Sequence, residues 1–372
     1  MTLLLDVVRT KKQKNDFVNL PFEIYRNDTY WVPPIKIDEL KSIDSDRNPA
    51  MRFCDAEFWV AYCNHKPVGR IGAIINHKYN EKVGEKLGRF SKLEFFDDGE
   101  VFQLLMDKAV AWMKEKGMSK VHGPLGFTNF DNQGLLIEGF DFLPSVASVY
   151  HYPYYQKHIE AYGFEKEIDW VEFRLRIGPK NIEKANRGSE LLKKRFGFEL
   201  VSFTKNSDII PHAATVFNIL NQAFAKLPYV TPFDKEMWNM YVKKYFKAIN
   251  PKYVYFVKKD EQILGFVVTV PSCSEAMQKA NGRLFPFGFY YLMKAMKHPK
   301  VIDFFLSAVI PEYEHQGVAV MLYAAVQNQM LKDGIDTIET TGIFETNHHA
   351  ISNWKNFDHI QHKRRRCFIK II

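Results

Sequence analysis

Residues 306–322 are the part of the chain whose residue types and spacing best suit chemistry. They read as an apolar strand, a tight loop and the start of a helix. Gly317 and Ala319 carry almost no side chain, so backbone N–H groups at the positive end of the helix can face an anion such as a phosphate. The N–H groups that we expect there belong to Gln316, Gly317, Val318, Ala319 and Val320. An ordinary strand-to-helix turn closed by glycine is the plainer interpretation, and this segment alone leaves both open.

The cysteines and histidines predict neither a metal site nor a disulfide framework. The cysteines are scattered and form no Cys-x-x-Cys pair: Cys54, Cys63, Cys273 and Cys367. We therefore expect free, mostly buried thiols. Four histidines near the end of the chain have spacings that match no helical ligand pair: His348, His349, His359 and His362. We expect these on the surface or at helix caps, and a protein without a metal.

The composition describes a packed globular protein with an anionic partner. Of the 372 residues, 46% are hydrophobic and 25% charged, which excludes a disordered chain, and the length suits two domains. The apolar run at the start is too short for a signal peptide, and the apolar stretch 301–310 is broken by Asp303. We expect a soluble, cytoplasmic protein with no transmembrane segment. The net charge of +8 suits a phosphate-bearing ligand, nucleic acid or a membrane surface alike.

The elements that must position the 306–322 segment occur twice in the chain. Residues 58–75 and 253–270 each contain two β-rich runs around a polar turn, which predicts a hairpin in each half. Each hairpin is followed by another strand, an amphipathic helix ending at glycine, a short strand, a further helix and a last β-rich run. The helices are expected at residues 101–117 and 318–334. Two unrelated α/β domains with the same order are the alternative to a duplication.

This order of elements and the spacing of the phosphate-loop residues resemble the GNAT superfamily of acyl-CoA N-acyltransferases. The residues that carry the resemblance are Val309, Pro311, Gly317, Val318, Ala319 and Leu322. The segments beginning at Trp31 and Gly123 further resemble a family of two-domain bacterial GNAT-like proteins. The resemblance implies an α/β (α+β) fold with two tandem GNAT-like domains, each a mixed, mainly antiparallel sheet flanked by helices. We expect a degenerate domain over 1–178, a linker over 179–195 and an acyl-CoA-binding domain over 196–372.

The resemblance also implies a co-substrate, acetyl-CoA or another acyl-CoA, and roles for individual residues. Backbone groups that would contact pantetheine map onto Ser307, Ala308 and Val309, and a cofactor-contacting asparagine maps onto Asn347. The tyrosine that often protonates the departing thiolate is replaced by Trp354, whose indole cannot act as that acid. Tyr313 and Tyr323 are the candidate substitutes. Glu339, at the end of a predicted strand, is the candidate base or acceptor anchor.

Several features depart from the family pattern or leave alternatives open. Glu314 stands where the phosphate loop usually has Arg or Gln, and an acid there is unfavourable for phosphate unless it turns outward. In the first half, residues 97–100 place three carboxylates at the equivalent helix start, so we expect no acyl-CoA there. The basic run 363–366 is expected to be a solvated edge or a contact to the 3′-phosphate of CoA.

An inserted segment around residues 272–299 is aromatic, Met-rich and basic. It suits a cover over an acceptor groove, a receptor for an acyl chain, a contact with a membrane surface, or a helix packed between the domains.

The predicted function is therefore an acyl-CoA-dependent N-acyltransferase, with acetyl-CoA as the expected donor and a small-molecule or peptide amine as acceptor. The alternative is a non-catalytic tandem GNAT-fold protein that binds a ligand or serves as a scaffold. A nucleic-acid partner is disfavoured, because it would rest on basicity and aromatic content alone.

Overall fold

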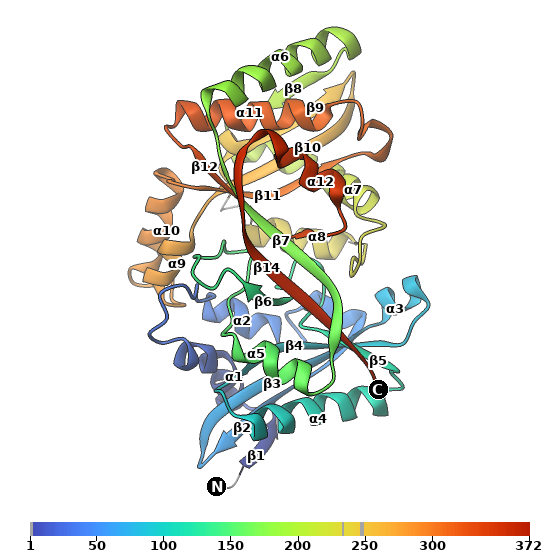
Figure 1. Ribbon diagram of the computed structural model, residues 1–372, viewed down its shortest axis with the longest axis vertical. Helices are drawn as coiled ribbons and strands as arrows, with labels where there is room; N and C mark the ends of the chain where they lie inside the picture. The colour runs from blue at the N-terminus through green and yellow to red at the C-terminus, as the bar shows by residue number, and fades with distance from the viewer. Residues whose placement is uncertain (1–2, 233, 246–248) are drawn as a thin grey trace. The chain divides into compact units, whose positions relative to one another are not determined.

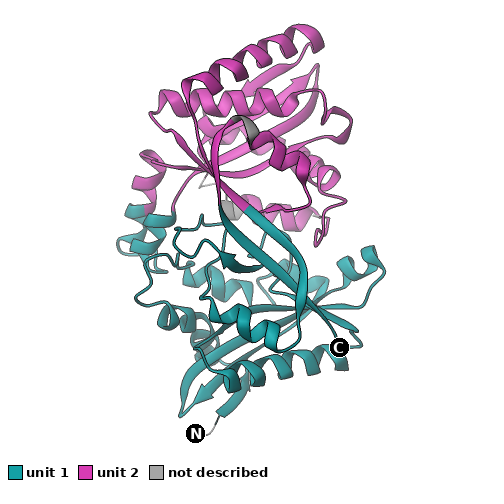
Figure 2. Cartoon of the chain, viewed as in Figure 1, with its two compact units in different colours: residues 1–171, 274–291, 362–372 teal, residues 172–273, 292–361 magenta. Residues whose placement is uncertain are grey.

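The computed structural model describes residues 3–232, 234–245 and 249–372, and the chain forms two compact units (Figures 1 and 2). Unit 1 consists of Met1–Val171, Ser274–Tyr291 and His362–Ile372. Unit 2 consists of Glu172–Cys273 and Leu292–Gln361.

Unit 1 is a mainly antiparallel sheet with helices on its faces. Its first-half elements are β1 (Leu3–Val7), α1 (Lys11–Ile24), α2 (Lys36–Ser42), β2 (Cys54–Cys63), β3 (Lys66–Asn76), α3 (His77–Val83), β4 (Leu87–Phe95), α4 (Gly99–Glu115), β5 (Lys120–Gly123), β6 (Leu135–Glu138) and α5 (Tyr154–Ala161). It also holds α9 (Ser274–Ala280). The strands follow the order β1-β2-β3-β4-β5, and only β4 and β5 run parallel.

The core of unit 1 lies between this sheet and α4. Val101, Leu105 and Met113 belong to the buried stripe that α4 turns to the strands. Gly69 on β3 allows this close approach, since a Cβ there would lie 2.7 Å from side-chain atoms of both Val101 and Leu105. Burial of this apolar stripe is the main force that holds the helix on the sheet.

Unit 2 repeats the same order of elements. These are β8 (Glu199–Ser202), α7 (Ala213–Ala223), α8 (Lys235–Tyr245), β9 (Val254–Lys259), β10 (Gln262–Pro271), β11 (Ile302–Val309), α11 (Val318–Lys332), β12 (Thr337–Thr340), β13 (Ile343–Phe344) and α12 (His348–Ser352). The strand order is β8-β9-β10-β11-β12, and β11 and β12 form the parallel pair. Gly265 on β10 matches Gly69, because a Cβ there would lie 3.1 Å from Val318 of α11.

The last strand of each half crosses into the other unit. The end of β7 (Glu165–Arg176) pairs with β12, whereas the end of β14 (Asp358–Ile371) pairs with β5. Each parallel pair is therefore completed by a strand from the opposite half of the sequence. The fold is the tandem mixed α/β arrangement that the sequence predicts, but the compact units are not contiguous stretches of chain. The division at residues 179–195 stays a prediction about the repeated sequence units.

The expected linker is a helix of unit 2, α6 (Pro179–Phe196). It packs along α11, with a 3.1 Å hydrogen bond from Asn186 to Asn328. Gly188 allows the contact, since a Cβ there would lie 3.3 Å from Val320. The inserted segment of the second half contains α9 and α10 (Gly288–Lys297).

Candidate active site

The strands β11 and β12 diverge in the middle of unit 2. They pair only where Ile302–Phe304 faces Ile338–Thr340. Beyond Leu306, β11 is paired with β10 alone among the strands that the structure describes. The edge of β11 at Ser307, Ala308 and Val309 therefore borders a wedge between the two strands, where their backbone groups can serve a ligand.

A bulge in β11 brings a second group of side chains to this wedge. The register with β10 shifts between Val268 and Thr269: Leu306 faces Val268 and Phe304 faces Thr269, so β11 contains one extra residue at this point. As a result Phe304 and Ser307 both meet Tyr323 of α11, which strict two-residue alternation would prevent. Burial raises the pKa of Tyr323, and the hydrogen bond with Ser307 offsets part of that shift. The phenol therefore stays protonated at neutral pH and is able to donate a proton.

Trp354 closes the same wedge. Its ring stacks on Tyr323 at 5.7 Å and meets Phe304 edge-on at 5.5 Å. The side chain is buried, and its indole N–H has no hydrogen-bond partner among the described residues. The structure thus brings Ser307, Tyr323 and Trp354 together. Tyr313 lies elsewhere, against Phe198.

The start of α11 forms the anion-binding end of the site. Gly317 is the N-cap residue with φ of 82°, and none of the described side chains caps this end. The N–H of Val320 bonds back to the carbonyl of Gly317 at 3.0 Å, so the first-turn N–H groups before it lack helical acceptors. The ring of His315, in this loop, lies 5.2 Å from that of His349 on α12. The starts of α11 and α12 therefore border one space.

The equivalent helix start in unit 1 is already occupied by protein groups. Asp98 caps α4 by accepting hydrogen bonds from the N–H groups of Glu100 and Val101 at 2.9 and 3.2 Å. Asp97 adds a second carboxylate, which pairs with His158 at 2.8 Å. Asp98 thus uses two of the N–H groups at this helix start, and the negative charge of both carboxylates repels a phosphate.

The wedge of unit 1 is filled as well. The hydroxyl of Tyr155, from α5, lies 3.2 Å from the N–H of Phe95 and donates to Glu94 at 2.7 Å. Tyr25 also donates to Glu94, at 2.7 Å. All these groups are buried. The strand edge that would hold pantetheine is thus engaged by a tyrosine of the protein itself.

Glu339 belongs to a buried row of charged residues whose members come from three strands and are not predicted by spacing in the sequence. Asp303 of β11, Glu339 of β12 and Arg174 of β7 are register partners across three neighbouring strands. Strand alternation places this row on the face opposite Phe304. Arg174 donates to Glu339 at 2.8 Å, and Asp303 and Glu339 are both almost fully buried. Glu172, also buried, adds its negative charge nearby.

Asp303 has the most perturbed environment of this row. Burial raises its pKa well above the usual value, and the charges of Glu339 and Glu172 raise it further, while Ser272 offsets part of the shift. Neither carboxyl oxygen has a hydrogen-bond partner of good geometry among the described residues. Buried carboxylates with raised pKa values are typical of proton-transfer sites. A sequence signal existed, since Asp303 interrupts an otherwise apolar strand.

The raised pKa of Asp303 predicts a stability effect of Asp303→Asn. A carboxyl whose pKa is higher in the folded state favours folding while protonated, and this advantage is lost as pH rises from about 4 through the folded-state pKa. The Asn variant does not titrate, so its free energy of unfolding should match that of the wild type near pH 4 and then exceed it by about 1.4 kcal/mol more for each pH unit inside that window. Urea unfolding at several pH values measures the difference. A constant difference across pH would contradict the assignment.

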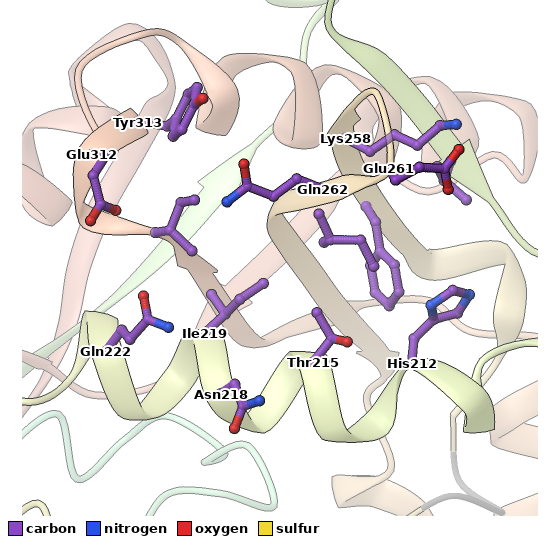
Figure 3. Close-up of a pocket in the computed structure, with 14 residues that line it drawn as sticks. His212, Thr215, Asn218, Ile219, Gln222, Lys258, Glu261, Gln262, Glu312 and Tyr313 are labelled. Carbon is purple, nitrogen blue, oxygen red and sulfur yellow. The ribbon is translucent and has the colours of Figure 1, made fainter.

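A pocket of about 860 Å³ with a mixed polar and apolar lining lies in unit 2 between α7 and the β9–β10 hairpin (Figure 3). His212, Thr215 and Asn218 line it from the helix side. Glu312 and Tyr313, from the loop before α11, lie at one end. Tyr313 is therefore placed to contact a ligand in this pocket. Asn347 caps α12 by accepting a 3.0 Å hydrogen bond from Ala350, and its contact with a cofactor stays a prediction.

The basic run near the end of the chain is wrongly interpreted from the sequence as a solvated edge. Lys363 and Arg365 are buried, and Arg364 and Arg366 bind the buried Asp169 at 3.1 and 2.8 Å. The run lies on a strand inside unit 1, where neighbouring chain neutralises its charge.

The described residues contain one cluster with the geometry to hold a metal. His122, Glu167 and Cys367 of unit 1 each place a ligand atom within 4.8 Å of the others. Glu167 lies 3.3 Å from His122 and 3.2 Å from Cys367, so hydrogen bonds within the cluster account for these contacts. Arg89 adds a positive charge near His122. The absence of a metal therefore stays a prediction. His362, expected near the surface, is buried.

Sequence comparisons relate part of the chain to a known family and most of it to two bacterial proteins. Residues 215–358 match the model of the acetyltransferase (GNAT) family. Protein YghO of Escherichia coli is 28% identical over 354 residues, covering 92% of this chain and 89% of that protein. The bacterial ceramide synthase of Caulobacter vibrioides is 24% identical over 302 residues, covering 78% of this chain and 75% of that enzyme.

Solved structures share the tandem fold. A tandem GNAT protein from the clavulanic acid biosynthesis pathway superposes with a TM-score of 0.58 at 12% identity, covering 100% of this chain and 98% of that chain. A GCN5-related N-acetyltransferase from Sphaerobacter thermophilus gives 0.53 at 10% identity, with 99% and 95% covered. Residues 215–358 thus match the GNAT family, and the chain as a whole has the tandem fold of the solved GNAT protein. Within the described ranges, every helix is too short or too polar to cross a membrane.

Proposed function

We propose that the protein is an acyl-CoA-dependent N-acyltransferase whose second half binds the co-substrate, with acetyl-CoA as the first donor to test. The observation that carries this proposal is the contrast between two equivalent helix starts. The start of α4 is capped by Asp98, whereas the start of α11 at Gly317 has no side-chain cap among the described residues. Only the second start leaves its N–H groups available to a pyrophosphate.

The co-substrate would bind along the wedge in unit 2. Its pyrophosphate would accept hydrogen bonds from the first N–H groups of α11, and its pantetheine would pair with the free edge of β11. The proposed contacts are Gln316, Gly317, Val318, Ala319 and Val320 at the phosphate loop, Ser307, Ala308 and Val309 on the strand, and Asn347. The N–H groups of Gln316 and Val320 already donate to the carbonyls of Tyr313 and Gly317, so the phosphate would be held mainly by the N–H groups of the three residues between them. Glu314 is half-buried in the loop, so its charge would weaken phosphate binding unless it faces away.

The chemical step needs one acid and one base. The amine nitrogen attacks the thioester carbonyl carbon, a C–N bond forms, and the C–S bond breaks. Tyr323 is the proposed acid, because its phenol is protonated and lies beside Ser307 on the wedge. The amine proton would pass to the carboxylate pair of Glu339 and Asp303. Arg174 holds Glu339, and burial gives Asp303 a higher proton affinity.

The acceptor is proposed to be a primary amine. One relative carries the name ceramide synthase, and a ceramide is the N-acylated form of a long-chain amino alcohol. Long-chain amines and long-chain acyl-CoA therefore stand beside acetyl-CoA and small amines in the first substrate panel. The non-catalytic alternative is favoured by one observation, the buried Trp354 where the family usually has a tyrosine.

Acyl-CoA is expected to stabilise the protein against unfolding. A ligand that binds only the folded state at about a hundred times its Kd adds about 2.7 kcal/mol, so the melting temperature should rise with CoA, acetyl-CoA or a long-chain acyl-CoA. Asp97→Ala in unit 1 should leave this rise unchanged, because that helix start is already capped. If none of the CoA species shifts the melting temperature, the proposed function is wrong. A shift without thiol release from any amine favours the non-catalytic alternative.

A further inference from the structure

The segment from Lys279 to Lys300 has an unusual composition. It contains five cationic residues and no acidic one: Lys279, Arg283, Lys294, Lys297 and Lys300. Between and beside them lie five aromatic residues: Phe285, Phe287, Phe289, Tyr290 and Tyr291. A surface rich in both kinds of residue suits a lipid interface, where rings enter the headgroup region and cations meet lipid phosphates.

The rings of this segment are turned to solvent. Phe285 is 78% exposed, Phe287 66% and Phe289 53%, and Tyr290 is 60% exposed. Among the other described phenylalanines only Phe96, at 42%, is comparably exposed. The chain buries nearly all its large rings, so four exposed rings within six positions form an apolar patch that requires an explanation.

The base of the segment is fixed to unit 1. Ser274 donates to the carbonyl of Pro144 at 2.7 Å, and Gln278 donates to that of Thr29 at 2.8 Å. The carbonyl of Gly282 accepts from the N–H of Lys36 at 3.0 Å. These hydrogen bonds hold α9 and the turn after it. The aromatic residues that follow therefore project from an anchored base and are not part of a loose loop.

The helix α10, labelled in Figure 1, continues the pattern of exposed rings and cations. Tyr290, Lys294 and Lys297 stand at i, i+4 and i+7, so they share one face of the helix. All three are exposed. An exposed ring and two cations on one helical face, next to three exposed phenylalanines, match the side-chain distribution of helices that lie in a membrane interface.

We propose that residues 279–300 dock the protein on bilayers that contain anionic lipids. Phe285, Phe287 and Phe289 enter the interface, and the five cations contact lipid phosphates. Charge complementarity selects this occupant, since the segment offers positive charge without a single acid. The docking is peripheral, because the described helices include none that can cross a bilayer. Combined with the proposed function, on which this extension rests, docking implies an amine acceptor held in the membrane.

Vesicle binding by the full-length protein tests the docking. Wild type should sediment with phosphatidylcholine vesicles that contain phosphatidylglycerol and bind pure phosphatidylcholine more weakly, with binding falling as salt is added. Phe285→Ser/Phe287→Ser/Phe289→Ser should lower the partition coefficient by at least about tenfold. The matched control Val83→Ser/Phe96→Ser/Leu191→Ser removes three exposed apolar side chains elsewhere and should bind like wild type. Lys294→Glu/Lys297→Glu should weaken binding to the anionic vesicles by about tenfold or more.

A fluorescence measurement uses variants that keep an aromatic residue at the changed position, so it does not depend on the folding of the triple Ser variant. Phe287→Trp should be quenched by brominated lipids more strongly than Phe96→Trp, since only the first position lies in the docking segment. Absence of wild-type vesicle binding overturns the proposal. A wild-type dimer that the triple Ser variant converts to monomer also overturns it, because a second copy of the chain would then cover the apolar patch.

Thiol release with a short soluble amine separates the docking hypothesis from the acyltransferase hypothesis. If a docking variant releases thiol normally with the soluble amine but not with a vesicle-embedded amine, both the docking and the acyltransferase hypotheses are supported. If the variant loses only its binding to vesicles, the acyltransferase proposal is unaffected.

Discussion

Gly317→Asp is expected to weaken acetyl-CoA binding by between several-fold and a hundredfold, on the order of 1–3 kcal/mol. Its carboxylate would stand at the start of α11, where the proposed pyrophosphate also places negative charge. The φ of 82° adds strain for any residue with a Cβ, about 1–2 kcal/mol of stability. That Cβ would lie 2.7 Å from the end of Leu192, a flexible side chain that is able to move. Isothermal titration calorimetry with the folded variant measures the loss of acetyl-CoA affinity.

Two controls separate charge from backbone strain. Gly317→Asn introduces the same shape without the charge and should lose much less affinity than Gly317→Asp. Gly334→Asp places the same residue at a positive φ of 71° just beyond the other end of α11, with no atom within 4 Å of its Cβ. It should bind acetyl-CoA like wild type. Equal affinity of Gly317→Asp and wild type would remove the phosphate loop from this position.

Local sequence patterns predict the elements around this loop because those elements form from near neighbours. The glycine and the small residues after it mark the start of α11, and the carboxylates at residues 97–100 mark the capped start of α4. Asp98 caps its own helix two and three residues away. Such contacts depend on spacing alone. The repeated order of elements is likewise a property of consecutive segments.

Local patterns do not predict that the last strand of each half pairs with the sheet of the other half, which we call the strand exchange. Nothing local tells residues 165–176 to pair with β12, or residues 358–371 to pair with β5. Because the two halves have the same order of elements, the last strand of either half suits both sheets, and long-range pairing decides between them. The wrong prediction of a solvated edge at residues 363–366 has the same cause. Its partner, Asp169, lies nearly two hundred positions away in the sequence and meets Arg364 and Arg366 only after the exchange.

The sequence predicts only one member of the carboxylate pair, for a related reason. Glu339 stands out as an acid at the end of a short strand, but its neighbours come from β11 and β7. In the sequence, Asp303 interrupts an apolar run, which argues against a membrane span but does not indicate a catalytic group. The register between β11 and β12, and not the spacing in the sequence, places Asp303 beside Glu339 and makes the two carboxylates a pair.

Neutralising this carboxylate pair is expected to have the largest effect on turnover. Glu339→Gln and Asp303→Asn should each lower kcat for thiol release by about 10²–10⁴-fold, the usual contribution of a general base. Because the pair shares one function, the double variant should be little slower than the slower single variant. Trp354→Phe should change kcat only weakly, since its indole cannot donate the proton to the thiolate.

The pH profile identifies which carboxylate receives the proton. The base must be ionised to act, so the raised pKa of Asp303 predicts that kcat rises with pH through that value and then levels. Asp303→Asn should remove this rise from its residual activity, whereas Glu339→Gln should shift it to lower pH, because a neighbouring negative charge is lost. Asp336→Asn, an exposed carboxylate just before the same strand β12, is the matched control and should leave both kcat and the profile unchanged. If an active wild type shows the same kcat and pH profile as both single variants, the amine proton leaves by another route and the pair is a structural feature of the sheet.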